Sequence, residues 1–411
     1  MKIRPFASTV AFGLLIQGFG VASGLTAARV LSPAERGEWS VVTLIPMTVA
    51  AFSLWGFEAE AARHVARSPR SAGTAVGQAA LLSAAVGLIL SGFAVIAAIL
   101  FSKYKSGSIA ATLIVCLSIL PYGFGQLVQT SMLASGRITQ FNVLRATSPA
   151  SYAVIVVSLA LLGALTVNTL ATALLASFLF SAVMAFWAFQ YAVQPLNFSL
   201  PSAKEAQALF RQATPTAALS VLTQFHHILA PSLVAAFCPL DQIGQFAVGM
   251  TFLSPVQVAA NAGAKLLFNK LADPTSTAAQ IKSLIVLSGA AMIGAYALAL
   301  ALAPLVIKFL IGGKFAFALV VMGAFGMWVI AAGLVTMFEE AVRATGNASI
   351  AVGVRACAAT ASLLTVVIVV RWFQPLWAIA LVMTVITAVE CGVVWRRFAK
   401  MLVKENAGNG R

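Results

Sequence analysis

The stretch LSPAERGEWSVV at residues 31–42 follows the first of twelve long apolar runs in this chain of 411 residues. A second version of it, FCPLDQIGQFAVG at residues 237–249, follows the seventh run. Pro33 and Pro239 correspond in the two stretches at an offset of 206 positions. The chain therefore contains one structural unit written twice, and this repeat decides the predicted fold.

Further pairs of residues support the repeat at nearly the same offset. They are Arg4 with Arg211, Gln17 with Gln224, Gly136 with Gly346, and Arg145 with Arg355. Because six runs separate the two copies, both copies enter the membrane from the same side. The repeat is then a parallel one, in which two six-helix lobes are related by a pseudo-two-fold axis along the membrane normal. Such an architecture is typical of alternating-access transporters.

The length of the runs predicts the secondary structure. A helix needs about 20 residues to cross ~30 Å of hydrocarbon, and helices satisfy their own backbone groups in lipid. Hydrophobic residues make up 61% of the chain and charged residues 9%, which excludes a soluble protein. We predict an all-α, polytopic membrane protein with twelve transmembrane helices at about 6–28, 39–62, 76–101, 109–133, 146–165, 170–192, 214–237, 243–268, 281–302, 317–342, 350–370 and 376–394.

The polar segments between the runs predict the domain organisation. The longest one contains Pro201 and Ser202, which predict the start of a short amphipathic helix carrying Ala206, Leu209 and Phe210 on one face. A flexible tether is the alternative there, and the C-terminal tail is expected to be disordered. The predicted parts are an N-terminal six-helix lobe at 1–193, a cytoplasmic linker at 194–212, a C-terminal six-helix lobe at 213–395 and a cytoplasmic tail at 396–411.

The basic residues predict the orientation in the membrane. Most of the 26 lysines and arginines lie in segments that face the cytoplasm if both termini are cytoplasmic. This asymmetry also explains most of the formal net charge of +15, so the charge does not indicate nucleic-acid binding. We expect the protein to be surrounded by membrane lipid and to bind no nucleic acid.

Three segments of the chain resemble a known family. They are the pattern L-x-P-x-x-x-G-x-aromatic at 31–39, Ala-Ser-Gly-Arg at 134–137 and FLIGGKFAFALVVMGAFG at 309–326. Together they resemble the polysaccharide transporter (Wzx-type flippase) family, which shares a superfamily with the multidrug and toxin extrusion transporters and the lipid II flippase. The resemblance implies an alternating-access flippase of the bacterial inner membrane. Its implied task is to move an undecaprenyl-diphosphate-linked oligosaccharide from the cytoplasmic to the periplasmic leaflet.

The same resemblance implies partners and an energy source. A polysaccharide polymerase and glycosyltransferases would supply or use the polyprenyl-diphosphate-linked saccharide. No cofactor is expected, and transport would be coupled to a proton gradient, a sodium gradient or the membrane potential. The four cysteines are scattered singly and show no metal-ligand spacing, so no metal site is predicted.

Two histidines deep in the seventh run are candidate substrate ligands. His226 and His227 lie about 18 Å from the predicted cytoplasmic end at 1.5 Å per residue. Ionisable residues at such depth are candidates for function, and histidine titrates near neutral pH. The structural alternative is a neutral pair that hydrogen-bonds between helices.

Four arginines are candidate ligands for the diphosphate, because guanidinium groups match phosphate oxygens. Arg29 and Arg36 flank the predicted outer end of the first run. Arg145 and Arg355 are repeat-mates near the predicted cytoplasmic boundary. The alternative role for all four is to anchor helices at the membrane interface.

Charged groups near the cytoplasmic ends of three runs are candidate gate residues. Glu60 can reach Arg63 and His64 at helical spacings. Glu58 and Lys265 are repeat-mates at an offset of 207, so we expect them to face each other across the two lobes. Snorkelling at a helix end is the alternative. The gate candidates are Glu58, Arg63, Lys265, Glu339, Glu340 and Arg343.

Three other classes of protein remain as alternatives. A drug or cation efflux transporter of the same superfamily is disfavoured because the first and seventh runs contain no acidic residue. A major-facilitator transporter would require a Gly- and Asp-containing motif where this chain has EAARHVARSPRSAG at 60–73. A membrane enzyme would need a substantial loop or a catalytic cluster, so no catalytic residue is predicted.

Overall fold

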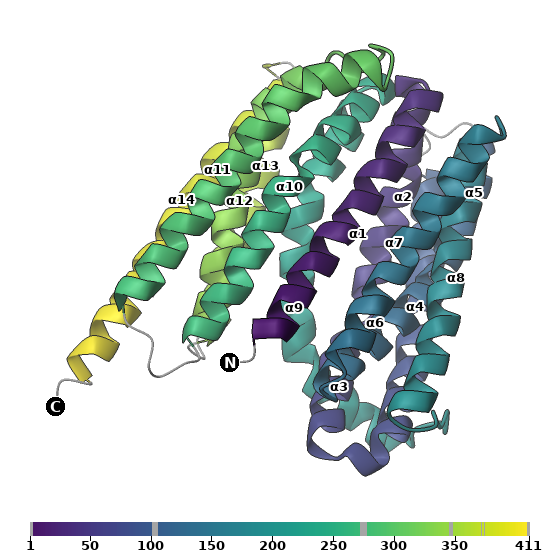
Figure 1. Cartoon of the computed structure of the whole chain (residues 1–411), viewed down its shortest axis with the longest axis vertical. Helices are drawn as coiled ribbons and strands as arrows, with labels where there is room; N and C mark the ends of the chain where they lie inside the picture. The colour runs from purple at the N-terminus through teal and green to yellow at the C-terminus, as the bar shows by residue number, and fades with distance from the viewer. Residues whose placement is uncertain are drawn as a thin grey trace. The chain divides into compact units, whose positions relative to one another are not determined.

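The computed structural model describes residues 3–100, 106–271, 278–344, 348–370, 372–373 and 375–408. Within these ranges the chain is helical, with one short 3-10 turn and no strand. Contacts divide it into two compact units, Met1–Gln224 and Phe225–Arg411. Figure 1 shows the helices coloured along the chain, with α1 beside α7 in the first unit.

The first unit contains eight complete helices and a turn. They are α1 (Ile3–Val30), α2 (Pro33–Ser53), α3 (Phe57–Arg67), η1 (Pro69–Ser71), α4 (Ala72–Leu100), α5 (Ser106–Leu117), α6 (Ile119–Ala134), α7 (Ile138–Leu161) and α8 (Val167–Ala192). Helix α9 (Ala203–Phe237) crosses the boundary. The second unit continues with α10 (Leu240–Leu271), α11 (Ala278–Phe309), α12 (Ala318–Ala344), α13 (Ala348–Val369) and α14 (Pro375–Gly408).

Each of the twelve predicted runs coincides with a helix or a pair of helices, so the all-α membrane fold is confirmed. In the described residues nine segments are long and apolar enough to cross a membrane. Large apolar side chains are more than half exposed on their outer faces, for example Leu88 and Phe93 of α4 and Leu287 of α11. Lipid tails can cover such an apolar surface, whereas its exposure to water would be unfavourable. The chain is a multi-pass membrane protein.

Two of the predicted runs are broken in the structure. The second run divides into α2 and α3 at Trp55 and Gly56, whose φ angles are 43° and 74°. Gly56 tolerates this left-handed conformation because it has no side chain, whereas Trp55 adopts it under tertiary constraint. The fourth run divides into α5 and α6 at Ser118, whose hydroxyl donates to the Val115 carbonyl at 2.6 Å. That bond competes with the regular helical ladder.

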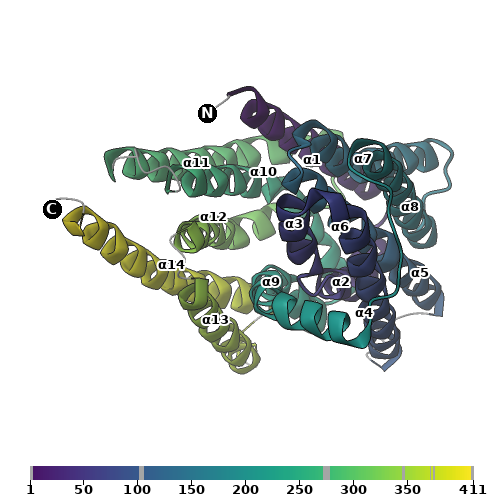
Figure 2. The same ribbon diagram turned by 90° about the horizontal axis from the view of Figure 1, so that it is seen from below.

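The two units share several of their helix pairings. In the second unit, α12 packs against α10, α11, α13 and α14, while α10 packs on α11 and α13 packs on α14. Figure 2 shows α12 between the α10–α11 pair and α14. In the first unit, α5 and α6 take the place of α12, and they pack against α2 and α3, α4, α7 and α8. In these pairings the repeat read from the sequence is also a repeat of helix packing.

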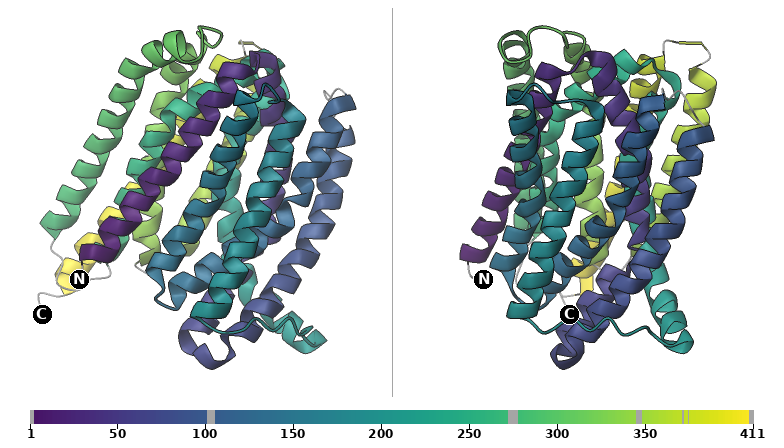
Figure 3. Two further views of the ribbon diagram at one scale, coloured as in Figure 1. Left: turned by 45° about the vertical axis from the view of Figure 1, so that its right-hand side comes forward. Right: turned by 90° about the vertical axis from the view of Figure 1, so that its right-hand side faces the viewer.

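The segment between α8 and α9 is fastened to the first unit. The Gln194 side chain accepts a hydrogen bond from the Gly73 backbone N–H at 3.0 Å and donates to the Arg70 carbonyl at 2.8 Å. A Cβ atom on Gly73 or Gly77 would lie about 2 Å from the carbonyl oxygen of Pro195 or Asn197. Figure 3 shows this coil crossing the end of the unit before α9 begins. The start of this segment is therefore held against the first unit and is not a free tether.

Two of the predicted part boundaries differ from the structure. Ser202 begins a helix, as predicted, and Ala206, Leu209 and Phe210 form its less exposed face. That helix does not end at residue 212 but continues as α9 to Phe237. At the other end, α14 continues through the predicted tail to Gly408.

Candidate functional site

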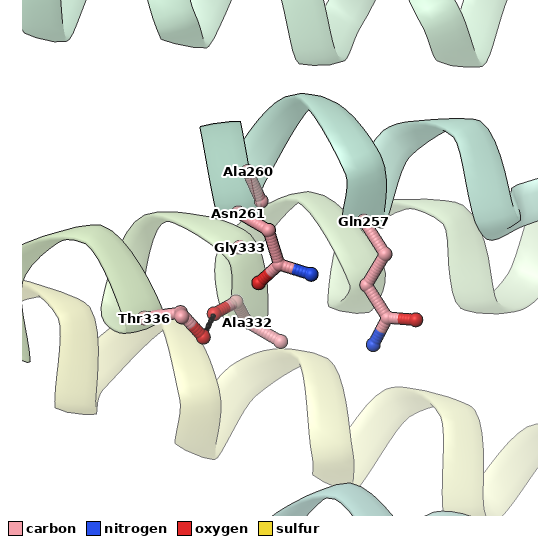
Figure 4. A pocket seen from close by; sticks show the side chains of 6 residues that line it. All are labelled: Gln257, Ala260, Asn261, Ala332, Gly333 and Thr336. Atoms are coloured by element: carbon pink, nitrogen blue, oxygen red, sulfur yellow. Dashed lines mark hydrogen bonds between the residues drawn. The ribbon is translucent and has the colours of Figure 1, made fainter. Parts of the chain in front are cut away.

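A pocket of about 230 Å³ lies between α10 and α12 in the second unit. Figure 4 shows Gln257 and Asn261 extending from α10 toward α12, where Thr336 donates a hydrogen bond to the Ala332 carbonyl at 2.9 Å. The remaining wall consists of Ala260, Ala332 and Gly333. Small residues leave the space open, and the carboxamides supply donors and acceptors inside it.

The pocket belongs to a polar stripe along α10. Ser254, Gln257, Asn261 and Lys265 recur at three- and four-residue spacings, which places them on one face of the helix. Gln257, Asn261 and Lys265 are exposed within the unit. A transmembrane helix with such a stripe borders water or another polar surface rather than lipid.

A buried ion cluster lies one turn beyond the pocket on α12. Arg355 of α13 donates from Nε to Glu339 Oε1 at 2.6 Å and from Nη2 to Glu339 Oε2 at 2.5 Å. Its Nε atom also lies 3.7 Å from Oε1 of Glu390 on α14. The three residues are only 1%, 3% and 2% exposed respectively. The bidentate pair joins α13 to α12, and the contact with Glu390 brings α14 to the same point.

The corresponding position of the first unit keeps the arginine but lacks both acids. An offset of 210 relates Arg355 to Arg145 and Glu339 to Gln129, and an offset of 209 relates Glu390 to Ser181. Gln129 and Ser181 are neighbours, since a Cβ on Gly125 would lie within about 4 Å of both side chains. Arg145 is half-buried, and its guanidinium lies 5.2 Å from the ring centroid of Phe141.

The other predicted phosphate ligands lie near the junction of α1 and α2. Arg29 is exposed in the last turn of α1. Arg36 is half-buried in the first turns of α2, and its Nε atom is buried without a hydrogen-bond partner among the described residues. Arg29 is thus accessible, Arg36 is largely covered, and the binding role of both stays a prediction.

The first gate cluster is partly as predicted. Glu60 pairs with Arg63 at 2.8 Å, which confirms the expected spacing. His64 does not join this pair, and its ring nitrogen instead lies 2.8 Å from the Ser71 hydroxyl. Glu58 is half-buried in the first turn of α3.

The remaining gate candidates belong to the second unit. Glu339 is engaged with Arg355, and Lys265 is exposed on α10. Glu340 and Arg343 belong to α12, but their side chains lie outside the described residues. The predicted pairing of Glu58 with Lys265 involves both units and stays a prediction.

The histidine prediction also lies outside the described side chains. His226 and His227 are in the helical part of α9, where the structure describes the backbone only. Sequence reasoning missed the amides of the pocket and Glu390. Glu390 carried a usable signal, because an acidic residue within an apolar run is a candidate for function by default. The amides carried no comparable signal.

Comparisons with known proteins agree with this architecture. A family model described as polysaccharide biosynthesis protein matches residues 27–320. No curated protein sequence matches the chain. An inward-facing multidrug resistance MATE family transporter of the MOP superfamily has a TM-score of 0.73 at 11% identity, covering 97% of this chain and 98% of that chain.

Two further solved structures give similar values. An outward-facing transporter of the same description has a TM-score of 0.68 at 14% identity, with 98% and 95% of the two chains covered. A MOP superfamily transporter from Pyrococcus furiosus, whose binding pocket is described as reversed in polarity, has a TM-score of 0.62 at 14% identity, with 97% and 95% covered. At such identities the likeness shows the fold, which is that of MOP superfamily transporters.

Proposed function

Because the chain belongs to the polysaccharide biosynthesis protein family, we propose that it is an alternating-access flippase for an undecaprenyl-diphosphate-linked oligosaccharide. The substrate moves from the cytoplasmic to the periplasmic leaflet of a bacterial inner membrane, and both termini of the protein are cytoplasmic. Glycosyltransferases supply the substrate and a polysaccharide polymerase consumes it. The lipid tail can remain in the bilayer, while the protein conducts the polar head.

The amide-lined pocket is the observation that carries this proposal. Sugar hydroxyls both donate and accept hydrogen bonds, as do the carboxamides of Gln257 and Asn261 and the hydroxyl of Thr336. A polar group that crosses hydrocarbon without partners costs several kcal/mol, and such a wall replaces the water that the sugar loses. Ala332 adds a small side chain to this wall, and Gly333 lets α12 approach Ala260 of α10, since a Cβ on Gly333 would lie 2.8 Å from the Ala260 Cβ.

The diphosphate requires cations rather than amides. Arg36 and Arg145 supply partly buried guanidinium nitrogens without hydrogen-bond partners among the described residues. Guanidinium groups bind phosphate oxygens with charge-assisted hydrogen bonds. Arg355 is less suited to this role, because Glu339 already occupies two of its donors.

Drug or cation efflux is the second candidate function, and the likeness to multidrug resistance transporters favours it. A cationic drug is best held by a carboxylate or an aromatic face. The six residues that line the described pocket include neither. The pocket chemistry therefore supports saccharide transport over efflux.

Deletion of the gene in its native host tests the proposed function. We expect undecaprenyl-linked oligosaccharide to accumulate on the inner leaflet, and wild-type protein to restore export. The double variant Gln257→Ala/Asn261→Ala removes two hydrogen-bonding groups and should slow export roughly tenfold or more. Gln207→Ala, an exposed amide on α9, is the matched control and should restore export fully. Normal export without the protein, together with increased drug sensitivity, would favour efflux instead.

A further inference from the structure

We propose that one end of the first unit binds the headgroups of anionic phospholipids. The surface consists of two arginines at the end of α3 and in η1, together with large side chains from the end of α8 and the coil that follows it. Its residues are Arg67, Arg70, Tyr191, Phe198 and Leu200, and we call them the α8–α9 surface. The inference concerns the membrane around the protein and does not depend on the proposed function.

Large apolar side chains are exposed on the α8–α9 surface. Tyr191 stacks on Trp187 of the same helix, with ring centroids 5.8 Å apart, and the two residues are 83% and 50% exposed. Phe198 is 46% exposed and Leu200 is 83% exposed. Such a cluster is unfavourable in water, and aromatic side chains with a polar tip are enriched where a membrane meets water. The exposed side chains therefore fit the interfacial layer of a membrane.

The coil that carries two of these side chains is held in place. The two hydrogen bonds of Gln194 fasten its start. Four residues later Phe198 packs against Phe124 of α6, with ring centroids 6.4 Å apart. Leu200 lies between this contact and the start of α9, whose first turn is hydrogen-bonded to the Ser202 hydroxyl. The exposure of Leu200 is therefore a property of the fold and not of a free chain.

The charge beside the coil is positive. Residues 61–73, AARHVARSPRSAG, include three arginines and a histidine but no acidic residue. Arg67 and Arg70 are exposed. The carbonyl of Arg70 accepts a hydrogen bond from Gln194, so this turn lies against the start of the coil. An anionic membrane surface attracts arginines in such a position.

An anionic phospholipid matches both parts of the α8–α9 surface. Its phosphate accepts charge-assisted hydrogen bonds from guanidinium groups, while its glycerol and acyl regions cover the apolar side chains. A zwitterionic lipid covers the apolar side chains but has no net charge that attracts the arginines. The exposed pair Lys204 and Glu205 at the start of α9 has opposite charges and does not alter this match.

The position of the surface favours a lipid over a soluble acidic partner. Helix α8 is long and apolar enough to cross a membrane from Val167 to Ala192, so Tyr191 lies at the end of a membrane span. The coil continues directly from that end. Lipid headgroups are therefore next to the surface at all times.

A fluorescent label at position 200 tests the proposal on the full-length protein in lipid nanodiscs, without any transport substrate. Leu200→Cys would carry a small environment-sensitive dye in a background of Cys357→Ser and Cys391→Ser, because Cys116 and Cys238 are buried. The nanodiscs contain phosphatidylcholine with the same small fraction of either brominated phosphatidylglycerol or brominated phosphatidylcholine. Bromine quenches the dye only at short range, so the quenching reports which lipid lies beside the coil.

We expect both brominated lipids to quench the dye, and brominated phosphatidylglycerol to quench it at least twofold more strongly. Arg67→Gln/Arg70→Gln should bring this ratio close to one, because glutamine keeps a polar side chain but not the charge. Added salt should also lower the ratio, since it screens the charge of exposed groups. The matched control is Arg396→Gln/Arg397→Gln, at two exposed positions of α14, and it should leave the ratio unchanged. All four arginines are exposed, so the variants should fold.

Four outcomes would overturn the proposal, and none of them depends on the export experiment. Failure of both lipids to quench would place the coil in water. Equal quenching by the two lipids would show an interfacial coil without a preference for anionic headgroups. A preference that survives Arg67→Gln/Arg70→Gln would assign it to other groups. A dye that responds to soluble polyglutamate and not to lipid would indicate an acidic protein partner instead.

Discussion

The ion cluster of the second unit and its counterpart in the first unit keep one arginine but differ in its surroundings. Arg355 is fully buried and meets two carboxyl groups, whereas Arg145 is half-buried and meets Phe141, with Gln129 and Ser181 at the acidic positions. Burial requires a counter-charge, and partial exposure does not. The duplicated position is therefore a buried ion cluster in one unit and a partly exposed cation in the other.

The largest expected effect is the difference in stability between the variant that lacks Arg355 and the variant that lacks Arg145. Arg355→Met leaves two buried carboxyl groups without their partner and should destabilise the protein by about 3–5 kcal/mol. Arg145→Met loses only a partly exposed cation–π contact, worth about 1 kcal/mol or less. Chemical denaturation in detergent, followed by tryptophan fluorescence, measures both values. Equal losses would show that the two arginines are not differently held.

The second test concerns the coil fastened to the first unit. In Gly77→Ala the new methyl group meets the Asn197 carbonyl oxygen at 2.1 Å, and the backbone must move. We expect a loss of about 1–3 kcal/mol, as for other overpacked sites. Gly92→Ala on the same helix is the matched control, since its Cβ meets nothing within 4 Å. Gly92→Ala should be neutral or slightly stabilising. A similar loss of stability in both variants would show that the coil between α8 and α9 is not closely packed on α4.

The third test gives the first unit the acid that the second unit has. Gln129→Glu places a carboxylate at the position that corresponds to Glu339, and it removes the hydrogen bond that the Gln129 amide donates to the Leu144 carbonyl at 3.5 Å. Desolvation should offset most of the attraction, so stability should change by no more than about 1 kcal/mol. Export should fall if Arg145 binds the diphosphate, because the arginine is then neutralised. Full export in Gln129→Glu would argue that Arg145 is only an anchor.

The smallest expected effect concerns the start of α9. The Ser202 backbone N–H and hydroxyl hydrogen-bond to the exposed Glu205 carboxylate and lower its pKa below the ordinary value. The resulting stabilisation is present above the pKa of the unfolded chain and is lost as the pH falls through the lowered pKa. Ser202→Ala should move the pKa of Glu205 upward in a carbon NMR titration of labelled glutamate. An unmoved pKa would mean that the hydroxyl contributes nothing.

The sequence was sufficient for the fold because its strongest signals are run length and repeat offset. These signals cannot show where a run breaks, since the conformation of Trp55 depends on tertiary contacts. The sequence repeat shows that Arg145 and Arg355 correspond to each other. It does not show that Arg355 would be buried and Arg145 partly exposed. That difference depends on Glu339 and Glu390, and Glu390 lies 35 residues from Arg355 in the sequence.

The prediction for Arg355 illustrates the limit most clearly. Its residue type indicated a phosphate ligand, while the structure gives two of its donors to Glu339. The pocket itself was unpredictable for another reason. Gln257 and Asn261 are ordinary polar residues in α10, and only the small residues opposite them on α12 turn that face into a cavity.

The central claim, that this protein moves a lipid-linked saccharide across a bilayer, is tested most directly by reconstitution. The purified protein would be placed in liposomes with undecaprenyl-diphosphate-linked oligosaccharide extracted from the deletion strain. A membrane-impermeant glycosidase then reports how much saccharide is exposed outside. We predict that the wild type brings nearly all of the substrate within reach of the enzyme, while Gln257→Ala/Asn261→Ala does so much more slowly. A reachable fraction that stays at the level of protein-free liposomes would contradict the account.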